Sequence, residues 1–274
     1  MHDKRRIFIQ SISSDIGFAL ANHWIEKGNE VIGTYRTKSE KTENLEKKDI
    51  ALKHCNLLNR TSIIECSNWA KLQENWDVLV VGAGSQDPIG LFEEVDFDKW
   101  EESLIENFIG QFRLIHELLP MRRKNSDRTP VVLLFAGGGT NNAVVRYSAY
   151  TISKIASIKM CELLDAENED TIFTIVGPGW VDTKIHGSTL KNKKHAGSNY
   201  QKTIEMIEGK KCFPIEKVVD CCDWLINAPR EIVGGRNFSA VHDPWNSTEI
   251  EKIGDDYNNF KLRRHGNDTF KEDK

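Results

Sequence analysis

Tyr150 and Lys154 form a pair whose residue types and spacing suit proton transfer. They lie four residues apart in the stretch YTISK, which places both side chains on one face of a helix. A free tyrosine titrates near pH ~10, which is too high for acid–base work at neutral pH. A neighbouring ammonium group favours the phenolate and lowers that pKa. The pair therefore predicts a group that exchanges a proton with a substrate oxygen.

Glycine-containing turns follow three apolar runs of the sequence, at residues 82–84, 137–139 and 177–179. In an open parallel sheet, ligands bind beyond the carboxyl ends of the strands. Glycine in such turns lets the backbone approach a ligand closely, although any one of them could serve only to turn the chain. Three such turns together predict a ligand-binding edge.

The elements that must position these residues alternate between apolar runs and amphipathic stretches, which is typical of a mostly parallel sheet with helices on both faces. We expect a doubly wound α/β fold with right-handed crossovers. The expected strands are residues 7–9, 30–35, 51–57, 77–81, 131–135, 172–176 and 237–241. The expected helices are residues 16–27, 61–73, 100–119, 148–167 and 216–227.

A single domain is expected over residues 1–245, because neither a repeat nor a Pro- or Ser-rich linker divides that range. Residues 183–214 would form its substrate loop. Residues 246–274 are polar and charged, so we expect a tail that is solvated or docked to a partner.

The first strand is followed by the turn QSISSDIG, residues 10–17. The N-terminus of a helix holds a pyrophosphate through its free N–H groups and its dipole. This turn has only one glycine, Gly17, and by itself it indicates no more than a helix capped by Ser or Asp.

In the order and spacing of these motifs, the span from residue 5 to about residue 245 resembles the short-chain dehydrogenase/reductase family. The matching segments are Ser13-Ser14-Asp15-Ile16-Gly17 for the end of T-G-x-x-x-G-x-G, Val81-Gly82-Ala83-Gly84 for N-N-A-G, Asn107 for the family asparagine, Tyr150 and Lys154 for Y-x-x-x-K, and Pro178-Gly179 with Thr183 for P-G…T. The stretch from Gly137 to Tyr150 and residues 239–245 also resemble reductases of surface-polysaccharide pathways.

The resemblance implies a Rossmann-type fold and an oxidoreductase mechanism. Tyr150 would exchange the proton at a substrate carbonyl or hydroxyl. Lys154 would hold the nicotinamide ribose and lower the pKa of the tyrosine, and Asn107 would help to hold a proton-relay water. The residues implied in cofactor binding are Ser11, Ser13, Ser14, Ile16, Gly17, Arg36, Asn56, Gly82, Ala83, Gly84, Tyr150, Lys154, Pro178, Gly179 and Thr183.

The sequence departs from the family pattern at several of these positions. Gly137 stands where the family has a substrate-orienting serine; Thr140, Asn141, Asn142, Ser148 or the backbone N–H groups of the triple glycine could replace it. Ser11 and Asp15 replace two glycines of the phosphate turn, and Asn56 replaces an aspartate beside the adenine. Asp15 would repel a diphosphate unless its side chain pointed away.

The choice of cofactor is expected at the end of the second strand, where an enzyme that uses NAD places an acid on the ribose. Here the stretch is Thr34-Tyr35-Arg36, which has no acid and has a guanidinium suited to a phosphate. We therefore expect NADP rather than NAD, unless Arg36 only begins a charged surface segment.

A local excess of positive charge in the substrate loop, joined by Arg146, favours a phosphorylated or nucleotide-linked substrate, or else a solvated loop. Its members are Lys184, His186, Lys191, Lys193, Lys194 and His195. We expect a polar carbonyl or hydroxyl substrate, such as a sugar derivative. The alternatives are a non-catalytic NADP-binding regulatory protein, favoured by Gly137, and a sugar-nucleotide epimerase or dehydratase, which normally has a larger C-terminal domain.

The composition excludes other classes of function. Lys and Arg number 37 against 41 Asp and Glu among 274 residues, a net charge of −4, so no general field attracts nucleic acid or membranes. No window approaches the ~20 apolar residues of a membrane span. The six cysteines lack CxxC spacing, which predicts reduced thiols and no metal site. We expect a cytoplasmic homodimer or homotetramer that associates through the helices at 100–119 and 148–167.

Overall fold

A seven-stranded parallel sheet forms the centre of the protein in a computed structural model, which describes residues 4–124 and 127–266. The strand order is β3-β2-β1-β4-β5-β6-β7. The strands are β1 (Arg6–Gln10), β2 (Glu30–Tyr35), β3 (Leu52–His54), β4 (Val78–Val81), β5 (Val131–Phe135), β6 (Ile172–Gly177) and β7 (Asn237–Ser239). β1, β4 and β5 are buried along their whole length, as the near-continuous apolar runs of a doubly covered sheet predict.

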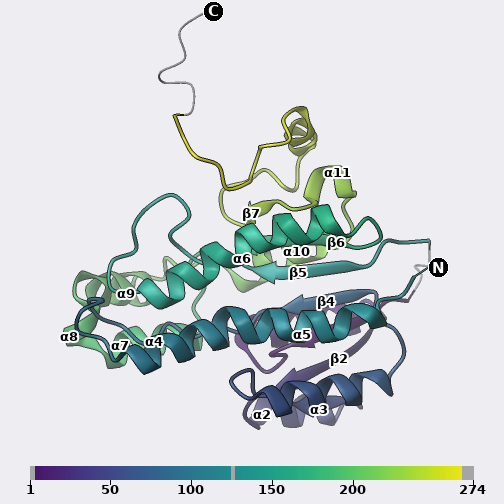
Figure 1. Ribbon diagram of the computed structural model, residues 1–274, viewed down its shortest axis with the longest axis horizontal. Helices are drawn as coiled ribbons and strands as arrows, with labels where there is room; N and C mark the ends of the chain where they lie inside the picture. The colour runs from purple at the N-terminus through teal and green to yellow at the C-terminus, as the bar shows by residue number, and fades with distance from the viewer. Residues whose placement is uncertain (1–3, 125–126, 267–274) are drawn as a thin grey trace, which may run out of the picture.

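Helices cover both faces of the sheet (Figure 1). α1 (Asp15–Glu26) and α10 (Ile215–Leu225) pack on one face, in a core that contains Leu20, Trp24 and Val218. α3 (Arg60–Lys71), α5 (Gly110–Leu118) and α6 (Ser148–Glu167) pack on the other face, in a second core. The remaining α-helices are α2 (Glu40–Glu46), α4 (Phe97–Leu104), α7 (Gly187–Lys191), α8 (Lys193–Ala196), α9 (Ser198–Glu208) and α11 (Arg230–Val233). The doubly wound α/β fold is thereby confirmed.

The helix expected over residues 100–119 is not regular. α4 begins earlier, at Phe97, and a π-helical turn, η1 (Ile105–Ile109), separates it from α5, which ends in a short 3-10 turn, η2 (Leu119–Met121). The Gln111 amide donates hydrogen bonds to the Glu106 and Ala83 carbonyls, so the widened turn is tied to the loop that follows β4. Apolar periodicity did not reveal this irregularity because it does not report on such side-chain bonds.

Two other segments are more ordered than the sequence suggested. The substrate loop contains the 3-10 turn η3 (Lys184–His186) followed by α7, α8 and α9, rather than solvated coil. Beyond residue 245, the 3-10 helix η4 (Thr248–Asp255) buries Ile250 and Ile253 against the core.

The chain after η4 is also attached to the sheet and to α6. The Asn237 N–H of β7 donates to the Phe260 carbonyl at 2.8 Å, and Arg263 forms an ion pair with Glu162 at 2.6 Å. No helix among residues 4–124 and 127–266 is long and apolar enough to cross a membrane.

Candidate active site

A cleft of about 1290 Å³ opens at the carboxyl ends of the strands. Turns that follow β1, β2, β4, β5 and β6 line it, together with α6 and the segment from Thr183 to Thr203. The connections reverse direction beside β1, which lies between β2 and β4, and such a switch point is where open α/β sheets bind ligands. The three glycine-containing turns therefore meet at one cleft.

Tyr150 and Lys154 both face this cleft from the first turns of α6. The Lys154 ammonium is buried, donates to the Phe135 carbonyl at 3.1 Å, and lies 3.4 Å from the Ala83 carbonyl. It also lies 5.8 Å from the centre of the Tyr150 ring. The helix thus brings the pair predicted from spacing to one site, and Lys154 is anchored by β5 and by the loop after β4.

The expected lowering of the tyrosine pKa is not found. Burial raises the pKa of Tyr150 to about 12 and lowers the pKa of Lys154 to about 8. Both directions follow because removal from water disfavours the charged form of either group. The phenol is therefore protonated at neutral pH, ready to donate rather than to accept.

Gly137 leaves room for the tyrosine hydroxyl. A Cβ atom at Gly137 would lie 2.8 Å from the Tyr150 hydroxyl oxygen and 2.9 Å from Lys154 Cγ. The space that the family serine would need is thus already taken by Tyr150. Of the residues expected to replace that serine, Thr140, Asn141 and Asn142 line the cleft. Ser148 does not line it, and its hydroxyl accepts from the Trp100 indole at 3.0 Å.

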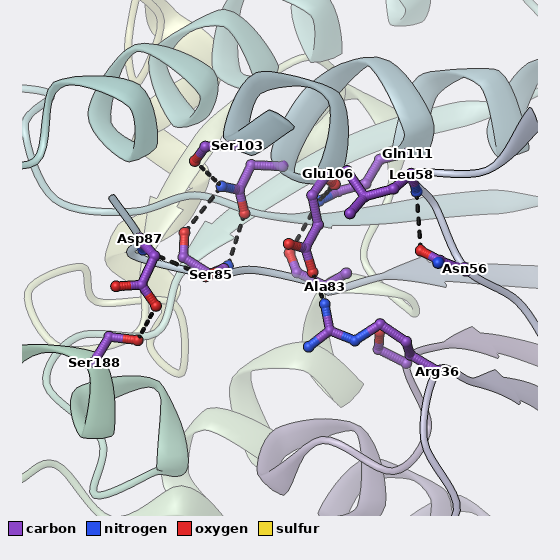
Figure 2. A network of polar contacts seen from close by, with 12 residues as sticks. Arg36, Asn56, Leu58, Ala83, Ser85, Asp87, Ser103, Glu106, Gln111 and Ser188 are labelled. Atoms are coloured by element: carbon purple, nitrogen blue, oxygen red, sulfur yellow. Dashed lines mark hydrogen bonds and ion pairs between the residues drawn. The ribbon is translucent and has the colours of Figure 1, made fainter. Parts of the chain in front are cut away.

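Asn107 lies on the π-helical turn, fully buried, and does not line the cleft. Its Oδ1 accepts from the Ser85 N–H at 2.8 Å, and its Nδ2 donates to the Ser85 carbonyl at 2.9 Å and to the Ser103 hydroxyl at 3.0 Å. Figure 2 shows Ser85 and Ser103 on either side of this network. The side chain therefore fixes the loop after β4 through both of its polar atoms.

The phosphate turn keeps its shape although Ser11 and Asp15 stand where the family has glycines. Ser11 has a φ of 60°, in the left-handed region that glycine adopts most readily. Ser14 caps α1 by accepting from the Gly17 N–H at 3.0 Å. A Cβ atom at Gly17 would lie 2.5 Å from the Ser11 carbonyl oxygen, so this one glycine is required.

The N-terminus of α1 fits a dinucleotide. Among the described residues, the N–H groups of Asp15 and Ile16 have no hydrogen-bond partner, and they are available to a diphosphate. Ser13 and Ser14 line the cleft beside them. Among residues 4–124 and 127–266, no group of His, Cys, Asp and Glu side chains is arranged to hold a metal ion.

Asp15 is held by two lysines. Its carboxylate accepts from the Lys41 ammonium and from the backbone N–H of Lys184 at 2.8 Å. Burial acts to raise the pKa of Asp15, but these hydrogen bonds and charges outweigh it and lower the pKa. Lys184 Nζ lies 3.5 Å from the Ser13 carbonyl. Lys184 was expected near the substrate, yet it lies at the phosphate turn, where it offsets the charge of Asp15.

Most of the other expected positive residues lie away from the cleft. Lys191, Lys193, Lys194 and His195 do not line it, because α7 and α8 carry them outside it. The exception is His186, which is buried and stacks on Trp180 with ring centres 4.6 Å apart. Arg146 donates to the His195 carbonyl at 3.0 Å and is also absent from the lining.

Arg36 and Asn56 were expected at the adenosine end. Arg36 follows β2, lines the cleft and forms an ion pair with Glu106, which Figure 2 shows opposite it. Asn56 does not line the cleft, and its Oδ1 accepts from the Leu58 N–H at 3.1 Å. Its side chain closes its own turn, so the expected contact with adenine is not supported here.

The remaining expected cofactor residues, Gly82, Ala83, Gly84, Pro178, Gly179 and Thr183, all line the cleft. Gln10, which sequence reasoning did not select, holds the first two of these through its Oε1, which accepts from the Gly82 and Ala83 N–H groups at 3.2 and 2.9 Å. Gln10 directly follows the apolar run Ile7-Phe8-Ile9, and a polar residue at that position was the sequence feature that could have identified it.

Sequence reasoning also missed a chain of polar groups at the other end of the cleft. The Tyr147 hydroxyl lies 2.7 Å from the Thr189 hydroxyl, which donates to Gln86 Oε1 at 3.0 Å. All three residues line the cleft, as does Lys202. They come from three segments far apart in the sequence, so spacing gave no signal.

Comparison with known proteins agrees with this architecture. The sequence model of the family described as short chain dehydrogenase matches residues 5–194. A 3-oxoacyl-[acyl-carrier-protein] reductase of Buchnera aphidicola is 26% identical over 241 residues, which span 86% of this chain and 95% of that protein.

Solved structures share the fold of this chain over most of its length. A short-chain dehydrogenase/reductase of Saccharomyces cerevisiae has a TM-score of 0.78 at 20% identity, over 88% of this chain and 97% of its own. A short-chain dehydrogenase of Shigella flexneri in complex with NADP has a TM-score of 0.72 at 18% identity, over 87% of this chain and 97% of its own. Other neighbours are complexes with NADPH and with NADH.

Proposed function

The chain belongs to the short-chain dehydrogenase family of NAD(P)-dependent oxidoreductases, and we propose that it uses NADP(H) to interconvert a polar carbonyl compound and its alcohol. The observation that carries this proposal is the placement of Tyr150 and Lys154 in the cleft that the phosphate turn of α1 also lines.

Tyr150 acts as the proton donor to the substrate oxygen during reduction. Because burial raises the pKa of Tyr150 to about 12, its hydroxyl carries a proton throughout the neutral range. The nicotinamide, when bound, supplies the hydride, and the protein orients the reacting groups. Lys154 is placed to hold the nicotinamide ribose, and its nearby charge stabilises the phenolate that remains after proton transfer.

The preference for NADP(H) is supported by the residues after β2. Arg36 and Lys38 line the cleft there, and no acid lies between Thr34 and Ser39. A guanidinium pairs well with a phosphate, whereas an acid at this place would favour the ribose hydroxyls of NAD. The NADP complex of the Shigella flexneri neighbour is consistent with this proposal.

A polar substrate is supported by the far end of the cleft. Gln86, Tyr147 and Thr189 present a connected set of hydroxyl and amide groups there. Such groups match a substrate with several hydroxyls, such as a sugar derivative. Lys202 also lines the cleft and could pair with a phosphate or nucleotide on that substrate.

The direct test is the absorbance of NADPH during incubation with a panel of aldoses, ketoses and their phosphates, each beside an apolar ketone of similar size. We expect oxidation of NADPH with one of the polar compounds and little with its apolar partner. Turnover only of apolar ketones would contradict the substrate class, and faster turnover with NADH would contradict the cofactor.

We further propose a homodimer or homotetramer formed through α4, α5 and α6. α6 packs beside α4 and η1 (Figure 1). Ile109 on η1 and Ile152 and Leu163 on α6 are 45%, 49% and 48% exposed. Contact with a second copy would bury apolar surface of this kind.

Substitution of Ile152 by Asp is therefore expected to shift the protein toward the monomer, because a charge would be placed in an apolar contact. Light scattering after size-exclusion chromatography measures the mass. Leu72→Asp, at a residue that is 83% exposed beyond the end of α3, serves as the control and should not change it. An unchanged mass for Ile152→Asp would count against this interface.

The cytoplasm is the proposed location, supported by the cysteines. All six are free thiols, and Cys55, Cys66, Cys161, Cys221 and Cys222 are buried. Free thiols of this kind are typical of a reducing compartment.

A further inference from the structure

A carboxylate occupies the part of the cleft where the cofactor phosphate is expected. Glu106 lies on the π-helical turn and forms an ion pair with the Arg36 guanidinium (Figure 2). Both residues line the cleft, with Thr37, Lys38 and Ser39 beside them. The residue proposed to select NADP(H) is thus already paired with a negative charge that belongs to the protein.

The two partners differ in their freedom to move. The Glu106 side chain is 17% exposed, and its backbone carbonyl accepts from the Gln111 amide. The next residue, Asn107, is fully buried and tied to Ser85. The Arg36 side chain is 57% exposed and extends from the turn after β2. Glu106 is therefore the fixed partner, and Arg36 is the one able to turn toward a ligand.

We propose that Glu106 is a specificity-determining residue that competes with the 2′-phosphate of NADP(H) for Arg36. This inference rests on the proposed use of NADP(H). A bound phosphate would have to take Arg36 from Glu106, and the loss of this ion pair weakens phosphate binding. The 2′-hydroxyl of NAD(H) is uncharged and can donate a hydrogen bond to the carboxylate. Glu106 thus reduces the preference for NADP(H) that Arg36 creates.

Removal of the Glu106 charge should change the affinity for NADPH and the affinity for NADH differently. We expect Glu106→Gln to tighten NADPH binding about three- to tenfold, a range set by the modest strength of partly exposed ion pairs. The Glu106→Gln variant should bind NADH as tightly as the unaltered protein or more weakly. Titration of protein fluorescence with each nucleotide gives both dissociation constants. Glu102→Gln is the matched control, because Glu102 is exposed on α4 and does not line the cleft.

A double-mutant cycle with Arg36→Ala tests the mechanism. Arg36→Ala should weaken the binding of NADPH more than the binding of NADH. In the Arg36→Ala background, Glu106→Gln should tighten NADPH binding only slightly. The inference is overturned if Glu106→Gln changes the dissociation constants of NADPH and NADH by the same factor, or changes neither of them. It is also overturned if Glu106→Gln tightens NADPH binding as much in the Arg36→Ala background as in the unaltered protein. Failure of the unaltered protein to bind NADPH would instead overturn the proposed function on which the inference rests.

Discussion

Replacement of Tyr150 by phenylalanine is expected to lower kcat by about 10²- to 10⁴-fold, the usual contribution of general acid–base catalysis. The ring would still fill its place on α6, but the hydroxyl that donates the proton would be absent. The Tyr150 hydroxyl makes no hydrogen bond to any described residue, so its removal breaks no contact that holds the fold. Steady-state turnover of the substrate found in the NADPH assay measures the effect.

Two controls separate chemistry from binding. NADPH titration should show a much smaller change in the dissociation constant of Tyr150→Phe than the change in kcat. Tyr147→Phe removes a hydroxyl that bonds Thr189 at the substrate end, and we expect it to raise KM more than it lowers kcat. If Tyr150→Phe kept more than a tenth of the normal kcat, another group would have to supply the proton.

Replacement of Gly137 by serine is expected to lower kcat by about 10- to 100-fold, although it restores the residue of the family pattern. The new Cβ would lie 2.8 Å from the Tyr150 hydroxyl oxygen and 2.9 Å from Lys154 Cγ, so at least one catalytic side chain must move. A displacement of about 1 Å in an active site can lower the rate about 10²-fold. The loss should appear in kcat, because the displaced groups act on the reacting atoms.

Gly138→Ser provides the matched control. A Cβ atom at Gly138 would meet only Val144 Cγ2, at 3.7 Å, which is ordinary contact. We expect this variant to keep most of the activity of the unaltered protein. An increase in kcat for Gly137→Ser would show that the glycine is a defect of this chain and that the site is not built around it.

The sequence predicted the fold and the placement of Tyr150 and Lys154 on one face of a helix, because both depend on local patterns. Apolar runs alternating with helical stretches indicate a parallel sheet wherever they occur, and a spacing of four residues places Tyr150 and Lys154 on one helical face. The glycine-containing turns were also informative, because parallel strands bring their carboxyl ends to one edge.

The contacts of Asn107 and Lys184 could not be predicted from local sequence patterns. The Asn107 side chain forms hydrogen bonds with Ser85 and Ser103, because the π-helical turn directs it inward. Lys184 belongs to the substrate loop in sequence but lies at Ser13 and Asp15 in space. Neither contact has a signature in spacing, because each joins segments that only the packed fold brings together.

The sequence by itself thus determined the fold class, the family resemblance and the residues able to move a proton, since these rest on periodicity and on the chemistry of single residues. Only the tertiary structure decided the direction in which the pKa of Tyr150 shifts, the space at Gly137 and the pairing of Arg36 with Glu106. These properties depend on burial and on distances between groups from different elements, and both arise only when the strands and helices pack.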